Sequence, residues 1–166
     1  MTSPAPSLLA SRTPGIILGL GLGGFVDGIL LHQILHWHNM ASARVAPVTL
    51  EAMQRNMRWD GLFHAAVWIL IVLGLYLLIG EARRGKRLPH ARELTGQLIL
   101  GWGLFNLVEG LVNHTILGIH HVRDLPVHVP IYDWLFLLIG GVGFVVLGHV
   151  ISSEARNRTG FSLRSK

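Results

Sequence analysis

Residues 19–38 read GLGLGGFVDGILLHQILHWH, and this segment is highly informative about the fold. It is apolar over the length of a transmembrane helix, because crossing a hydrocarbon core of about 30 Å takes roughly 20 apolar residues. Its ionisable side chains are Asp27 and, near its end, His32, His36 and His38. Its glycines recur at four-residue spacing, which lets neighbouring helices approach closely in lipid. The stretch therefore predicts a transmembrane helix that carries ionisable groups into a packed bundle.

The same pattern recurs later in the chain, where residues 101–120 read GWGLFNLVEGLVNHTILGIH. Nine of the twenty aligned positions are identical. Three pairs of ionisable residues coincide in this alignment: Asp27 with Glu109, His32 with His114, and His38 with His120. The helices that follow also open alike, with WDGLF at 59–63 and YDWLF at 132–136. We expect two tandem helical hairpins, about residues 15–80 and 95–151, related by a pseudo-two-fold axis along the membrane normal, as in some transporters.

The composition of the whole chain also indicates a membrane protein. Hydrophobic residues make up 51% of the sequence and charged residues 14%, against about 25% charged in a typical soluble domain. So few charges cannot cover a water-soluble globule. We expect an all-α, integral membrane four-helix bundle that forms a single transmembrane domain over residues 1–166. The predicted spans are about 15–37, 61–80, 95–120 and 131–151.

The basic residues predict how the bundle is oriented. Ten of the fourteen lie in the N-terminus, the 81–93 loop and the C-terminal tail, whereas the opposite loops carry four. The positive-inside rule therefore places both termini and the middle loop in the cytoplasm. A nucleic-acid partner is excluded, because the basic residues flank apolar runs instead of forming one soluble face. We also expect a short interfacial helix at about 49–58.

Ionisable residues gather at the predicted outer face. Eight of the ten histidines fall there, together with Asp60, Asp124 and Asp133, while Asp27 and Glu109 lie deeper. Neutral imidazole combined with carboxylate suits Zn, Cu(II), Fe or Mn. There is no cysteine, which excludes thiolate ligands and disulfides. The pattern therefore predicts a transition-metal site near the outer end of the bundle.

Helical spacing selects the candidate ligands, since side chains at i and i+4 share a face and can reach one ion. His32 and His36 have this spacing, and so do Asp60 and His64. The candidate metal ligands are His32, His36, Asp60, His64, His114, His120 and His121. The candidate partners of these ligands, or steps of a proton route, are Asp27, Glu109, Asn113 and Asp133. A hydrogen-bonded polar core without metal is the alternative.

Three segments resemble an uncharacterised bacterial family of short, four-span membrane proteins with a domain of unknown function. They are GFVDGILLHQILHWHN at 24–39, DGLFHA at 60–65 and GLFNLVEGLVNHTILGIHHVRD at 103–124. The resemblance covers nearly the whole transmembrane region. It implies a multi-pass protein of the bacterial inner membrane and supplies no activity.

These observations favour a bacterial inner-membrane metalloprotein whose His/carboxylate site lies at the periplasmic end of the bundle. If the site is catalytic, oxidative or hydrolytic chemistry on a membrane-accessible substrate would suit it. Three alternatives stay open: a copper- or zinc-handling or assembly factor, a b-type haem protein, and a small transporter or accessory subunit without metal. The expected surroundings are the lipid bilayer and either another membrane enzyme complex or further copies of this chain.

Overall fold

The structure is a computed structural model that describes residues 9–164, and it is all-α. Four long helices make up the molecule, and three of them contain a π-helical segment. In chain order the elements are α1 (Thr13–Val26) with η1 (Asp27–Ile34), α2 (Leu50–Arg83), α3 (Ala91–Glu109) with η2 (Gly110–Ile116), and α4 (Pro130–Leu135) with η3 (Phe136–Gly143) and α5 (Phe144–Arg164). The expectation of an all-helical fold with four helices is thus confirmed.

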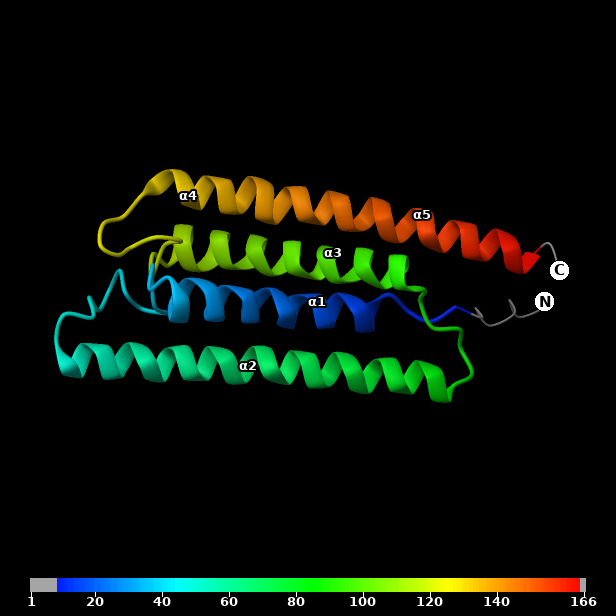
Figure 1. Cartoon of the computed structure of the whole chain (residues 1–166), viewed down its shortest axis with the longest axis horizontal. Helices are drawn as coiled ribbons and strands as arrows, with labels where there is room; N and C mark the ends of the chain where they lie inside the picture. Colours follow the sequence, from blue (N-terminus) through cyan, green and yellow to red (C-terminus); the bar gives the residue numbers. More distant parts are fainter. Residues whose placement is uncertain (1–8, 165–166) are drawn as a thin grey trace.

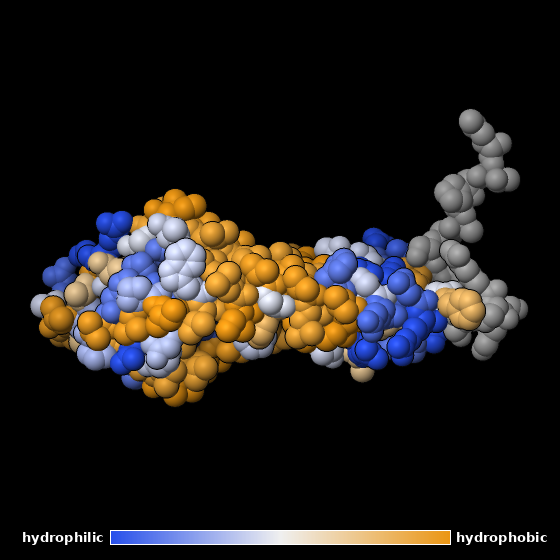
Figure 2. Space-filling view, turned by 90° about the horizontal axis from the view of Figure 1, so that it is seen from above, coloured by the Kyte–Doolittle hydropathy of each residue, from blue (hydrophilic) through white to orange (hydrophobic). Residues whose placement is uncertain are grey.

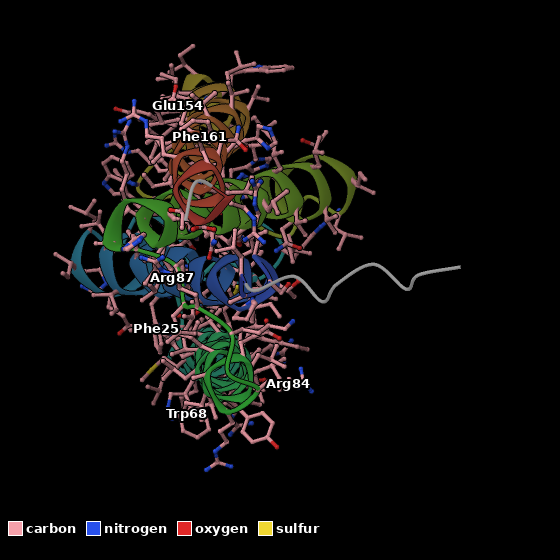
Figure 3. All side chains as sticks on the ribbon, turned by 90° about the vertical axis from the view of Figure 1, so that its right-hand side faces the viewer. Phe25, Trp68, Arg84, Arg87, Glu154 and Phe161 are labelled. Atoms are coloured by element: carbon pink, nitrogen blue, oxygen red, sulfur yellow. The ribbon has the colours of Figure 1, made fainter. Side chains whose placement is uncertain are left out.

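The helices lie side by side in the order α2, α1, α3, α5 (Figures 1 and 3). The central contact between α1 and α3 depends on glycine at two aligned positions. A Cβ atom at Gly19 would collide with the carbonyl oxygen of Leu98, and one at Gly101 with that of Ile16. The two backbones therefore touch directly, which is the way helices without large apolar side chains at their interface associate in lipid.

Three of the four helices are long and apolar enough to cross a membrane, namely Thr13–Ile34, Leu50–Arg83 and Pro130–Phe161. The third predicted span, 95–120, corresponds to α3 and η2. This helix is not among those apolar enough to cross a membrane by the same measure. The reason is its interior position between α1 and α5, where it carries buried polar residues: Glu93, Gln97, Asn106 and Glu109. Figure 2 shows the resulting surface, an apolar middle with hydrophilic residues at both ends.

Two details differ from the sequence-based expectations. Residues 50–58 are helical as expected, but they do not form a separate short helix, because α2 runs unbroken from Leu50 to Arg83. The Thr49 side chain accepts a hydrogen bond from the Ala52 amide at 3.2 Å at its start. The first and third helices also end early, at Ile34 and Ile116. The histidines that follow these ends therefore lie on connecting segments.

Candidate metal centre

The site lies where η1 and η2 end, at the end of the bundle opposite the start of α1 and the end of α5 (Figure 1). Each of these segments ends with a hydrogen bond to the carbonyl five residues earlier, from Leu35 to Leu30 and from Leu117 to Val112, both 2.8 Å. Each is followed by a residue with left-handed backbone geometry, His36 at φ 51° and Gly118 at φ 53°. This turn folds the next residues back over the helix end. Such π-helical turns are frequent at functional sites.

The first half of the chain contributes Asp27, His32 and His38, which are all buried. The Nε2 atom of His32 lies 3.2 Å from Oδ2 of Asp27, and Nε2 of His38 lies 3.8 Å from the same oxygen. The ligand atoms of the three side chains lie within 4.8 Å of one another, so that one metal ion could bind all three.

The second half contributes Glu109, His114 and His120, also buried and also within 4.8 Å of one another. Nε2 of His120 lies 3.1 Å from Oε1 of Glu109. The two groups meet where the rings of His38 and His120 stack, with centroids 4.7 Å apart and planes at 11°. We call these six residues the central cluster: Asp27, His32, His38, Glu109, His114 and His120.

Backbone carbonyls fix the tautomers of two histidines in the central cluster. Nδ1 of His38 lies 2.9 Å from the carbonyl oxygen of Val122, and Nδ1 of His120 lies 3.1 Å from that of Met40. Because a carbonyl oxygen can only accept, both Nδ1 atoms carry the proton. When these rings are neutral, Nε2 is unprotonated, and its lone pair faces a carboxylate. Two such electron-rich atoms repel unless a proton or a metal cation lies between them.

Two further carboxylates hold the remaining histidines. Nδ1 of His32 lies 3.1 Å from Oδ1 of Asp60, and Nδ1 of His114 lies 3.4 Å from Oδ1 of Asp133. Each aspartate is itself fixed by a backbone amide at 2.8 Å, from Met40 and Val122 respectively. A carboxylate behind a histidine ring orients the ring and raises its basicity, as it does at many metal sites.

The geometry and charge of the central cluster suit a metal ion. Two donors on one ion, each about 2.0–2.2 Å from it, are separated by roughly 2.9–3.4 Å. The 3.2 Å between His32 and Asp27 and the 3.1 Å between His120 and Glu109 fall in this range. Within residues 9–164, every ion-pair partner of Asp27, Asp60, Glu109 and Asp133 is a histidine. No lysine or arginine there balances the buried negative charge.

The structure brings most of the sequence-predicted residues together. His32, His114 and His120 belong to the central cluster, and Asp60 and Asp133 stand behind two of its rings. Asp27 and Glu109, expected as partners of the ligands or steps of a proton route, supply the carboxylates that face the imidazoles. The Asn113 side chain donates a hydrogen bond to Oε1 of Glu109 at 3.3 Å.

Three predicted ligands lie elsewhere. His36 is exposed, because the helix ends at Ile34 and the i, i+4 geometry with His32 does not form. Nδ1 of His64 donates to the carbonyl oxygen of Asp60 at 2.8 Å, and its ring lies 6.5 Å from that of His32, beside the central cluster. His121 belongs to a separate, more exposed group.

His38 is the residue that the sequence-based ligand set omitted. It is fully buried at the centre of the site. A signal for it existed, since the internal alignment pairs His38 with the predicted ligand His120. Helical periodicity could not find it, because His38 reaches the site only through the left-handed turn at His36.

The fold and the site together define a multi-pass helical membrane protein with buried His/Asp/Glu groups that could bind metal. The chain belongs to the family described as predicted membrane protein (DUF2243), which matches residues 14–155. This match confirms the family resemblance seen in the sequence, and no function is established for the family. No curated protein and no solved structure matches the chain.

Proposed function

We propose that the protein is a bacterial inner-membrane metalloprotein with two adjacent His₂–carboxylate centres at the outer end of the bundle. His32, His38 and Asp27 would hold one ion, and the second ion would be held by His114, His120 and Glu109. The observation that carries the proposal is the pair of backbone-fixed histidines, His38 and His120, whose Nε2 atoms face buried carboxylates. Two histidines and one carboxylate are a donor set used by zinc enzymes and by non-haem iron enzymes.

Charge balance supports two ions instead of one. Asp27, Asp60, Glu109 and Asp133 carry four negative charges when ionised, and two divalent cations would offset all four with every imidazole neutral. A charge buried without a partner is costly, so this balance favours metal binding over a polar core. A bound metal would supply Lewis-acid or redox chemistry. The chain's own contribution is to orient the rings, through Asp60 and Asp133 and through the carbonyls of Val122 and Met40.

We also propose that the two centres are related by the internal repeat, as two hairpins about a pseudo-two-fold axis. Reciprocal contacts across the centre support this arrangement. His38 contacts Val122 while His120 contacts Met40, and both pairs of positions are aligned in the repeat. The backbone is paired in the same way, with Ala43 donating to the Ile119 carbonyl and Leu125 donating to the Trp37 carbonyl.

The orientation is part of the proposal. The end of the bundle with the start of α1, the end of α5 and the 84–90 connection holds most of the basic residues, and the positive-inside rule assigns that end to the cytoplasm. The central cluster would then face the periplasm. The b-type haem alternative has less support, because the histidine rings pack against each other at centroid distances of 4.4–4.9 Å and leave no gap for a macrocycle.

Elemental analysis tests the proposal, on protein purified in mild detergent without metal-affinity chromatography. We expect about two ions of Fe, Zn, Mn or Cu per chain. His38→Ala and His120→Ala should each lose metal, whereas His36→Asn should keep it. Asparagine tolerates the left-handed backbone at position 36, so this variant is a matched control. Folded wild-type protein that binds no metal after reconstitution would contradict the proposal.

A further inference from the structure

A third group of side chains that could hold a metal ion lies outside the central cluster, on the surface of the second half. Nδ1 of His121 and Nε2 of His128 each lie 3.1 Å from the same oxygen, Oδ2 of Asp133. The two rings stack with centroids 4.1 Å apart. The side chains of His121, His128 and Asp133 are 25%, 41% and 17% exposed, in contrast to the buried central cluster. We call these three residues the surface triad.

Asp133 joins the surface triad to the central cluster. Its Oδ2 faces the two exposed histidines, while its Oδ1 lies 3.4 Å from Nδ1 of the buried His114. A cavity of about 300 Å³ borders the same residues. Its lining includes His114, His121 and Asp133, together with the apolar Pro130, Trp134 and Leu137. The cavity thus reaches from the exposed triad to a proposed ligand of the buried centre.

In the first half, the residues described from position 9 onward form no such triad. Asn39 is aligned with His121, and its amide donates to Oδ2 of Asp60 at 2.7 Å. An amide nitrogen is no metal ligand, so the group that holds the aspartate here does not supply the nitrogen donor that an imidazole at position 121 supplies. The surface triad is therefore a feature added to one half of an otherwise paired arrangement. If Asp133 had only a structural role, an amide side chain at position 121 would be enough to hold it, as Asn39 holds Asp60 in the first half.

We propose that the surface triad captures a divalent transition-metal ion from the outer side and delivers it, past Asp133 and through the cavity, to the buried centre at His114. This inference rests on the proposed function of the central cluster. Three protein donors leave coordination positions open to water. Such a partly exposed site exchanges its ion readily, which is what a capture site requires. The buried centre, enclosed by side chains, needs a route of this kind.

Co²⁺ uptake by metal-free protein in detergent, followed by visible absorption in a stopped-flow instrument, tests the delivery. We expect a fast, reversible phase from the surface triad and a slow phase from the central cluster. His128→Ala should abolish the fast phase and slow the second by about tenfold or more at limiting Co²⁺, which is the size of effect that residues outside the direct ligand set have at known metal sites. The final occupancy of the central cluster should stay unchanged. His36→Asn, which removes an exposed histidine outside both groups, should load like the wild type.

A substitution in the central cluster, instead of in the surface triad, separates this inference from the proposed function. His38→Ala should lose part of the slow phase and keep the fast phase. Loading of His128→Ala at the wild-type rate would overturn the delivery. A wild-type protein with only the fast phase, dependent on His128, would overturn the proposed function and the delivery together while supporting the surface triad as a metal site. Absence of both phases would overturn both proposals.

Discussion

His38 and His120 differ from the other histidines in what holds them. Each donates its Nδ1 proton to a backbone carbonyl across the centre, so its orientation is set by the main chain and not by a mobile partner. His64, by contrast, donates to a carbonyl of its own helix. His36 projects from a left-handed turn and is exposed. At the residue scale, therefore, a main-chain carbonyl from across the centre fixes the direction in which His38 and His120 present Nε2 to the carboxylates.

The same reasoning gives a prediction for Asp60. It accepts the Met40 amide and the Asn39 side chain and faces Nδ1 of His32. Asp60→Asn keeps the size but puts an amide donor where an acceptor is needed, so that His32 loses its orientation. We expect metal affinity of the first centre to fall about 10–100-fold, with the second centre retained. Chelator competition on the purified variant measures this.

Asp133→Asn is the matched comparison for this experiment, because Asp133 stands behind His114 as Asp60 stands behind His32. It should weaken the second centre and spare the first. Equal loss of both ions in either variant would contradict two separately held centres.

At the scale of the elements, two features place the site: the direct contact of α1 with α3, and the π-helical turns at their ends. The first brings the helices that carry the central cluster together without intervening side chains at Gly19 and Gly101. The second turns the chain back so that His38 and His120 cover the helix ends. A shift between α1 and α3 would therefore separate the two groups of ligands.

Gly101→Ala tests the helix contact. Its Cβ would collide with the Ile16 carbonyl, so the helices must separate, and overpacking of this kind costs about 1–3 kcal/mol of unfolding free energy. Gly80→Ala is the control, because a Cβ there meets nothing within 4 Å and alanine favours the helix by about 1 kcal/mol. Reversible unfolding in detergent mixtures measures both. Equal stability of the two variants would refute the close contact.

The sequence could predict some of these features and not others. The apolar runs located all four helices, and the 19–38 and 101–120 alignment paired the residues that meet in the central cluster. Helical periodicity misplaced His36 and omitted His38, because it assumes that the helix continues. The backbone instead leaves the helix at Ile34, through hydrogen bonds to carbonyls five and six residues earlier. The apolar residues around Ile34 do not indicate that the helix ends there.

For the molecule as a whole, the site joins the two halves of the chain. Backbone and side-chain hydrogen bonds cross between the two halves at this end of the bundle. In one of them, the Ser42 hydroxyl donates to the Asp124 carboxylate at 2.6 Å. The opposite end is held by other contacts, such as the ion pair of Arg156 with Glu93 at 3.0 Å. The two proposed centres lie where the halves meet, and hydrogen bonds from His38 and His120 cross between the halves. Because the ligands come together only in the folded state, metal binding should stabilise the entire bundle.

We therefore expect added metal to raise the unfolding free energy of the wild-type protein by about 2.7 kcal/mol for each centre whose dissociation constant is exceeded 100-fold by free metal. The variant His38→Ala combined with His120→Ala should gain little, because both centres lose a ligand. Denaturation in detergent with buffered Zn²⁺ or Co²⁺ measures the difference. Equal gains in both proteins would place the bound metal elsewhere.

The orientation of the molecule can be tested because the natural chain contains no cysteine, so a single introduced thiol reports one position. Val127 is 61% exposed at the end with the central cluster, and Arg84 is exposed at the opposite end (Figure 3). With the basic end in the cytoplasm, a membrane-impermeant maleimide on intact bacterial cells should label Val127→Cys and spare Arg84→Cys. After permeabilisation both should react. If Arg84→Cys were labelled and Val127→Cys spared, the central cluster and the surface triad would face the cytoplasm, where the metal supply is different. Capture of metal from the periplasm would then be excluded.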